Sequence, residues 1–488
     1  MDKMNKTQLQ RAIGYFHGVT FLLSSIIGAG IFIAPKGVLK YSSLNVGITL
    51  SIWVACAVVS MTAALTYAEV GTTFPQSGAQ YYFLKRSLGS PFFFFCLWIH
   101  FFTTPAEIAG RTLLLAEYAI QPFYPGCFAP ALPKKCLALA ILWSLGIFSV
   151  QGVNKITWFQ TISTMMKTSV LCLIALSGAM LLVIRKENLI RLGSTFSSDL
   201  PNISQIPEAF FQGLYAYSGW HSLVSIAGEV KNPEKNIPRC IFTALFLVTI
   251  LYLLVNIAYL TVLTPEEIIA SDAVAMTWID RVIPSCQWII SIGVSTSILS
   301  GLLSTTFSSS RLYYCASQEG QIPLLFSMLN NHSSPALPVI QTIIFASVMI
   351  IPSDIIRLIN LIGFVVSIEN VLIITGLIKL RYQKPNLPRP FKVHLSLAFG
   401  TVIMFLLLVL IPIIQSPKMH HIYIFFFILM GFLLYLGFVH YKLHFGWFDE
   451  VTCYLQLLLN ISPPEGPEEY MSKEITLPKK YSEVSTKI

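Results

Sequence analysis

The sequence predicts an all-α polytopic membrane protein with twelve transmembrane helices and both termini in the cytoplasm. Its 488 residues are 55% hydrophobic and only 11% charged, whereas soluble domains carry roughly 25% charged residues. Apolar stretches of about 20 residues, the length that spans a bilayer as a helix, recur along the chain. Lys and Arg are concentrated in alternate loops between these stretches, and this bias indicates the orientation.

The twelve predicted spans differ in length and continuity. Nine are long, at 13–35, 45–69, 91–120, 159–184, 207–228, 239–262, 287–309, 354–379 and 421–443. Three are shorter or interrupted, at 137–152, 336–351 and 394–415. The first span is too long for a cleaved signal peptide and lacks a small-residue cleavage pattern. We therefore expect a cytoplasmic tail at 1–12 before it, and a second, partly disordered one at 444–488.

The loop charges set the predicted sidedness. The loops on the side of the two termini carry 20 Lys and Arg, and the opposite loops carry 10. An excess of basic residues in cytoplasmic loops is the usual pattern, so the net charge of +9 follows from topology. A nucleic-acid-binding protein would instead concentrate basic residues on one soluble face. We expect a lipid bilayer around the chain and no nucleic acid partner.

No reactive centre is apparent in the sequence. The nine cysteines lack the spacing of metal ligands, and we expect no metal site and no cofactor. His100 and His221 have no acidic neighbour in the sequence that would form a catalytic pair. We therefore expect no catalytic residues and do not predict an enzyme. A channel would show a filter or rings of like charge, and none is readable.

The first span contains the sequence IIGAGIF at 26–32, with small residues where a continuous helix is expected. Small residues allow helices to pack closely, or they mark a break that a cavity or neighbouring groups must satisfy. A dinucleotide-binding loop is excluded, because Ile33 stands where its third glycine is needed. The first span alone leaves packing and interruption open.

The sixth span repeats the feature with YAYSGW at 215–220. The two interruptions occupy equal places in two five-span halves, which is typical of a secondary transporter's binding site. A broken helix frees N–H groups and C=O groups at its two inner ends, and these match the carboxylate and ammonium of an amino acid. The predicted substrate-binding residues are Ile27, Gly28, Ala29, Gly30, Tyr215, Ala216, Tyr217, Ser218 and Gly219.

Seven ordered motifs extend over nearly the whole chain. They are IIGAGIF (26–32), YAEVGTTFPQSGAQYYFLKRSLG (67–89), YAYSGW (215–220), GEVKNPEKNIPR (228–239), NIAYLTVLTPEEIIASDAVAMTW (256–278), SSSRLYYCASQEGQIP (308–323) and LRYQKPNLPRPFKV (380–393). The sequence resembles in these motifs the light chains of the heteromeric amino acid transporters, solute carrier family 7 of the APC superfamily. Two divergent branches, one of asc type and one a renal carrier of aspartate and glutamate, look most similar.

The resemblance implies a LeuT-like fold and a transport activity. The fold is an inverted repeat of five plus five helices, at 13–184 and 207–379, followed by two extra helices at 394–443. The activity is sodium-independent exchange of amino acids across the plasma membrane by alternating access. Ala79 and Gly228 depart from the family's motifs, so a non-transporting membrane partner protein with a degenerate site is an alternative.

The resemblance also implies roles for single residues. Lys167 lies inside the fifth span, where an unpaired cation is costly, and matches a lysine that replaces a bound sodium ion in the family. Tyr215 matches an aromatic gate over the substrate. Cys127 stands in an outer loop where the family forms a disulfide to a single-pass glycoprotein heavy chain. An internal bond to Cys136 is the alternative for this cysteine.

Few residues bear on the substrate side chain. The cystine and glutamate carriers of the family have arginines where this chain has Thr104 and Val366. Arg111 lies four residues after Glu107, so the two are expected to neutralise each other on one helix face. Glu369 would repel an acidic side chain that it faced. We expect small neutral amino acids as substrates, with acidic amino acids or cystine as the alternative.

Two surface features complete the predictions. Asn202 lies in a glycosylation sequon that is predicted to face outward. The last three residues, 486–488, fit a carboxyl-terminal ligand of a PDZ-domain protein.

Overall fold

The computed structural model describes residues 13–75, 79–124, 130–150, 153–184, 200–271, 273–284, 287–330, 334–351, 355–415, 419–441, 447–459 and 461. Within these ranges the chain is helical apart from its connections, and an isolated parallel bridge joins Ile13 to Val230. The predicted all-α class is confirmed for the residues described.

The helices follow one another with short connections. The first half contains α1 (Tyr15–Ile26), α2 (Gly30–Tyr41), α3 (Val46–Thr73), α4 (Ala79–Ser87), α5 (Ser90–Ile120), α6 (Ala131–Val150) and α7 (Val153–Ile184). The second half contains α9 (Ile206–Ala216), α10 (Ser222–Ser225), α11 (Pro233–Val262), α12 (Pro265–Ala270), α13 (Val274–Val282), α14 (Gln287–Gln318), α15 (Ala336–Met349) and α16 (Ile355–Gln383). After these come α17 (Leu395–Gln415), α18 (Met419–Leu434) and α19 (Trp447–Leu459).

Most of the predicted spans are long apolar helices. Among the described residues, eight helices are long and apolar enough to cross a membrane, and α1 with α2 makes a ninth span bent by 49°. The other three predicted stretches also contain helices, but these are shorter or broken. They are α9 with α10, α15 with 14 residues, and α18, which continues as a π-helix at Tyr435–His440.

Local sequence sets where several helices begin. Asn45 caps α3, because its side chain accepts a hydrogen bond from a first-turn amide 3.1 Å away. Thr264 and Glu267 form a capping box at the start of α12. The connection before α5 turns at Gly89, with φ +103°, which glycine adopts at little cost. These devices satisfy amides that a helix start leaves unpaired.

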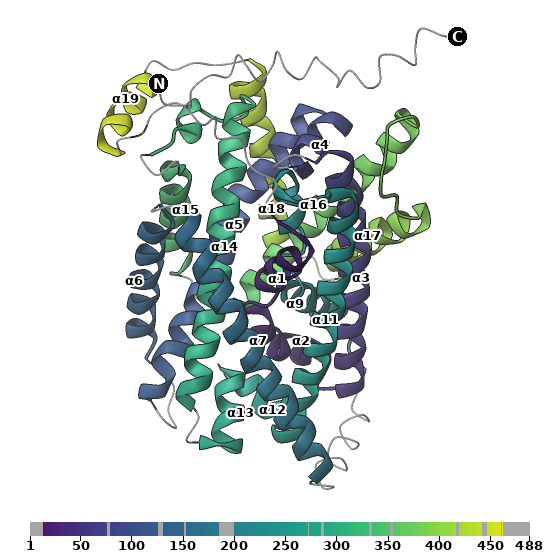
Figure 1. The fold of residues 1–488 in the computed structure, drawn as a ribbon, viewed down its shortest axis with the longest axis vertical. Helices are drawn as coiled ribbons and strands as arrows, with labels where there is room; N and C mark the ends of the chain where they lie inside the picture. The colour runs from purple at the N-terminus through teal and green to yellow at the C-terminus, as the bar shows by residue number, and fades with distance from the viewer. Residues whose placement is uncertain are drawn as a thin grey trace.

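The helices form one bundle with α5 and α14 near its centre. The spans of these two helices are the most buried, whereas α6 and α17 are the least buried and lie at opposite sides in Figure 1. Large apolar side chains of the outer helices are exposed, among them Trp143, Leu176 and Ile403, as expected for a surface in contact with lipid. α4 and α19 lie at one end of the bundle, and α12 and α13 lie at the other (Figure 1).

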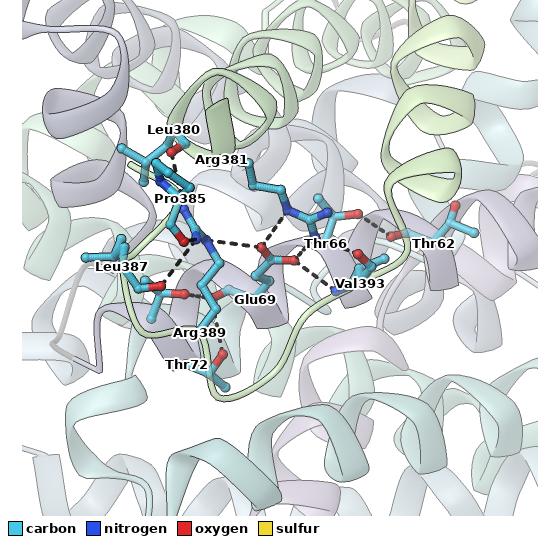
Figure 2. Close-up of polar contacts among 11 residues, drawn as sticks. Thr62, Thr66, Glu69, Thr72, Leu380, Arg381, Pro385, Leu387, Arg389 and Val393 are labelled. Carbon is cyan, nitrogen blue, oxygen red and sulfur yellow. Dashed lines mark hydrogen bonds and ion pairs between the residues drawn. The ribbon is translucent and has the colours of Figure 1, made fainter. Parts of the chain in front are cut away.

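A buried carboxylate joins distant parts of the chain where α3 and α16 end (Figure 2). Glu69 on α3 is completely buried and accepts hydrogen bonds from the Arg381 guanidinium, whose Nε is 2.9 Å away. It also accepts one from the amide of Val393 at 2.9 Å. Arg389 approaches Glu69 to 3.8 Å. Its guanidinium donates to carbonyl groups at the end of α16, those of Leu380, Lys384, Pro385 and Leu387.

This network is complete in the way that buried charges require. A buried carboxylate is tolerated only when its oxygens are paired and hydrogen-bonded, and here two cations and one amide surround it. Because both arginines and Val393 lie in or after the end of α16, Glu69 holds the connection from α16 to α17 against α3 (Figure 2).

We predict that Arg381→Met lowers the free energy of unfolding by about 3–5 kcal/mol, the usual cost of removing one partner from a buried ion pair. The measurement is a thermal or denaturant melt of the purified full chain in detergent. Lys384→Met is the matched control, because Lys384 is exposed and contributes only its backbone carbonyl. Equal melting of the two variants would contradict the assigned role.

Candidate functional site

The first break separates α1 from α2 at residues 27–29. Within the described part of the chain, the amides of Gly28, Ala29 and Gly30 donate no backbone hydrogen bond. They therefore form an amide-rich helix start, as the sequence predicts. A Cβ atom placed on Gly28 would have no atom within 4 Å, so open space lies beside this residue.

The carbonyl groups at the end of α1 receive the ammonium of Lys167. Its Nζ donates to the Ser24 carbonyl at 2.8 Å and to the Ile27 carbonyl at 3.0 Å. The hydroxyls of Ser24 and Ser300 lie 3.3 and 3.4 Å from the same nitrogen. Lys167 is 1% exposed, so a buried cation on α7 joins the break in the first span to α14.

Tyr252 on α11 contacts both breaks. Its hydroxyl lies 3.1 Å from the Ile26 carbonyl at the end of α1 and 3.2 Å from the Ala216 carbonyl at the end of α9. Tyr252 is completely buried. One side chain thus holds the two inner helix ends beside each other, and it was missed in the sequence because it lies in an uninterrupted apolar helix.

The two breaks are in direct contact. Gly219, at φ +102°, leaves no room for a side chain, because a Cβ atom there would lie 2.5 Å from the Ser25 carbonyl oxygen. A Cβ atom on Gly30 would lie 2.4 Å from the Cα atom of Ala216. Gly30 therefore serves close helix packing, while Gly28 borders open space. The two interpretations of GAG both hold, each for a different glycine.

The remaining predicted site residues divide between core and site. Ile27, Ala29 and Ala216 have buried side chains and can offer only backbone groups. Tyr217 is also buried, and its ring packs against Trp53 and Tyr252. Tyr215 and Ser218 are partly exposed, so among the side chains of the second break these two are available to a ligand.

A charged pair on α5 lies beside the two breaks. Arg111 donates to Glu107, as predicted, and its Nη1 donates to Thr305 on α14 at 3.0 Å. Its guanidinium carbon lies 5.9 Å from the centre of the Tyr215 ring. The same guanidinium and Gly28 both lie within about 4 Å of a Cβ atom placed on Gly301. The predicted gate residue is therefore in contact range of the only arginine inside a predicted span.

A second charged pair was not foreseen. His100 Nε2 lies 2.9 Å from Glu369 Oε1, although the two are separated by 269 residues. The expectation that His100 lacks an acidic neighbour is wrong, because α5 and α16 pack together. Thr104, at one of the family's arginine positions, is buried on the same helix.

Some predicted sites cannot be placed. Cys127 and the carboxyl-terminal residues 486–488 lie outside the described residues. Asn202 is exposed and begins the short 3-10 helix before α9. Cys136 is an exposed free thiol.

Comparison with known proteins places the chain in a family. The family model for amino acid permeases matches residues 13–439. The chain belongs to the amino acid permease family. It is 51% identical over 475 residues to solute carrier family 7 member 13 of Mus musculus, with 97% of this chain and 99% of the relative covered.

Two further relatives of this permease carry informative names. Solute carrier family 7 member 12 of Mus musculus is 49% identical over 462 residues, which are 95% of this chain and 99% of the relative. The b(0,+)-type amino acid transporter 1 of Homo sapiens is 36% identical over 469 residues, 95% of each chain. The resemblance to solute carrier family 7 is thus confirmed, and the chain is a multi-pass membrane protein of a family of amino acid transporters.

We predict that Gly28→Ala and Gly30→Ala separate the two uses of glycine. Gly28→Ala should fold normally, because a methyl group there meets nothing. It should reduce amino acid uptake by about tenfold, equivalent to about 1.4 kcal/mol of lost binding. Gly30→Ala should reduce the amount of folded protein, because its methyl group meets Ala216. Uptake is measured per molecule at the surface, with size-exclusion profiles as the control for folding. Full uptake by Gly28→Ala would contradict this division.

We predict that Lys167→Met reduces exchange by more than about tenfold. Methionine cannot donate to the carbonyls of Ser24 and Ile27, and each buried acceptor left without a donor costs about 1–3 kcal/mol. Lys235→Met, at an exposed position, is the matched control. Full exchange by Lys167→Met at equal surface expression would remove Lys167 from the site.

Proposed function

We propose that this permease is a sodium-independent amino acid exchanger of the plasma membrane. It crosses the bilayer twelve times with both termini in the cytoplasm and works by alternating access between repeats at 13–184 and 207–379. The placement of α4 and α19 at one end of the bundle, opposite α12 and α13, supports this sidedness (Figure 1). The observation that carries the proposal is the contact between two broken helices beside unpaired amides.

The proposed site binds the common part of an amino acid through the main chain. The amides of residues 28–30, at the positive end of α2, take the carboxylate. The carbonyl end of α9, at 215–219, takes the ammonium. Ile27 contributes differently from the prediction, since its carbonyl already accepts from Lys167. Tyr215, beside Arg111, closes over the bound substrate as the gate.

Sodium independence is supported by the surroundings of Lys167. In a coupled transporter, carbonyl and hydroxyl oxygens of this kind would surround a metal ion. Here the ammonium lies within 3.4 Å of four such oxygens. Lys167 is thus proposed as the resident cation, which removes the need for a sodium ion at this place.

Small neutral amino acids are the proposed substrates. Glu107 neutralises Arg111, and Glu369 adds a negative charge whose printed partner is His100, so an acidic side chain finds no uncompensated cation. Acidic amino acids or cystine are the second candidate. One observation favours them: the Nε of Arg111 is buried and has no hydrogen-bond partner among the described residues.

The proposed partner is a single-pass glycoprotein heavy chain joined through Cys127. Loss of a high-molecular-weight band on reducing gels, absent in Cys127→Ser, is the expected result in native membranes. A band unaffected by reduction would exclude the disulfide. Sugar at Asn202, which is exposed, and a PDZ-domain protein at 486–488 are additional proposals. The complete arrangement at both breaks argues against a non-transporting partner protein.

We predict trans-stimulated uptake in cells that express the full chain with candidate heavy chains. Cells are preloaded with unlabelled alanine or glutamate, and labelled alanine uptake is measured in sodium and in sodium-free medium. Alanine preloading should increase uptake several-fold, equally in both media. Stimulation by glutamate alone would replace the neutral class with the acidic one. Absence of any trans-stimulation with every heavy chain would contradict exchange.

A further inference from the structure

The pair of His100 and Glu369 is a buried acid and base that the proposed substrate site does not use. The His100 side chain is 21% exposed and the Glu369 side chain is 7% exposed. His100 lies about two helical turns from Glu107 on the same face of α5, with Thr104 between them. The pair therefore lies on the helix that also carries Arg111, beside the two breaks.

Neighbouring groups hold the pair in place. The hydroxyl of Tyr313 donates to the His100 carbonyl at 3.1 Å. Tyr67 on α3 donates to Asn370, the residue after Glu369, at 3.0 Å, and its ring packs against Trp220 in the second break at 4.8 Å. A change at this pair is thus in contact, through Tyr67, with the segment that is proposed to bind substrate.

The charge of the pair depends on one proton. Without it, neutral histidine faces a carboxylate and the pair carries a net charge of −1. With it, on the imidazole or on the carboxyl, the pair is neutral. The titratable and charged groups that act on the pair from the surrounding elements are Tyr67 of α3, Cys96, Glu107 and Arg111 of α5, His221 after α9, and Tyr313 of α14. Glu107 and Arg111 cancel, so Glu369 has His100 as its ion-pair partner among the described residues.

We propose that His100 and Glu369 form a proton-binding site that controls the rate of amino acid exchange. The proton comes from water and returns to water, and no covalent bond to the substrate is made. Loss of the proton leaves an uncompensated carboxylate in a low-dielectric interior, which is costly. The transport states that bury the pair are then disfavoured. Exchange is therefore fast with the proton bound and slow without it.

The inference rests on the proposed function, and exchange in liposomes containing the purified full chain tests it. Equal pH on both sides is set at 6, 7 and 8, a range in which histidine changes charge and the backbone charges of amino acids stay constant. The unmodified chain should slow by about tenfold or more from pH 6 to pH 8, equivalent to about 1.4 kcal/mol.

Two variants are expected to bracket this behaviour. Glu369→Gln mimics the neutral pair and should exchange at one rate, independent of pH. His100→Gln keeps the carboxylate charged and should be slow throughout. His17→Gln is the matched control, because His17 is exposed, and it should retain the pH profile of the unmodified chain. A flat profile for the unmodified chain, or an unaltered profile in Glu369→Gln, would overturn the proposal.

A second measurement separates the proton site from the transport activity. Infrared difference spectra of the purified chain in lipid, between pH 6 and pH 8, report carboxyl and imidazole protonation without any substrate. A band that both Glu369→Gln and His100→Gln remove supports the site even if no amino acid is exchanged. If neither variant changes the spectrum, the pair does not bind a proton in this range.

Discussion

Two helices broken inside a membrane impose the constraint on which the rest of this structure depends. Backbone groups freed there cannot turn to water, and each unpaired one costs several kcal/mol in hydrocarbon. Lys167 and Tyr252 supply the donors for the carbonyl ends of α1 and α9. α7 and α11, which carry them, must therefore pack on the breaks, and they do. The amide ends have no such protein partners, which leaves them for a ligand that brings its own carboxylate.

The sequence predicted the spans, the breaks and the residues of IIGAGIF because these are local patterns. It also predicted the pairing of Glu107 with Arg111, which follows from helical spacing alone. It could not predict His100 with Glu369 or Glu69 with Arg381, because such contacts depend on how helices far apart in the chain pack. Tyr252 gave no signal, since a tyrosine in an apolar helix is usually packing. Ser300 and Thr305 lie in a Ser/Thr-rich stretch of α14 that would have marked a polar surface.

One face of α5 gathers the charges of the interior. It carries His100 and, two and three turns further on, Glu107 and Arg111, with partners on α16 and α14. Each cation on this face is matched by an anion within hydrogen-bond distance, as burial requires. The central helix of the bundle is thus both the most enclosed and among the most polar, and its polar groups face the broken helices.

The Glu69 network has a consequence for biosynthesis. Glu69 enters the membrane early, but its partners Arg381, Arg389 and Val393 are made more than 300 residues later. Until α16 and its connection to α17 arrive, the first half of the protein holds a carboxylate without a partner at the end of α3. The half-made chain is consequently held back from its final packing, and the quality-control machinery of the membrane can distinguish it from a finished one by this charge.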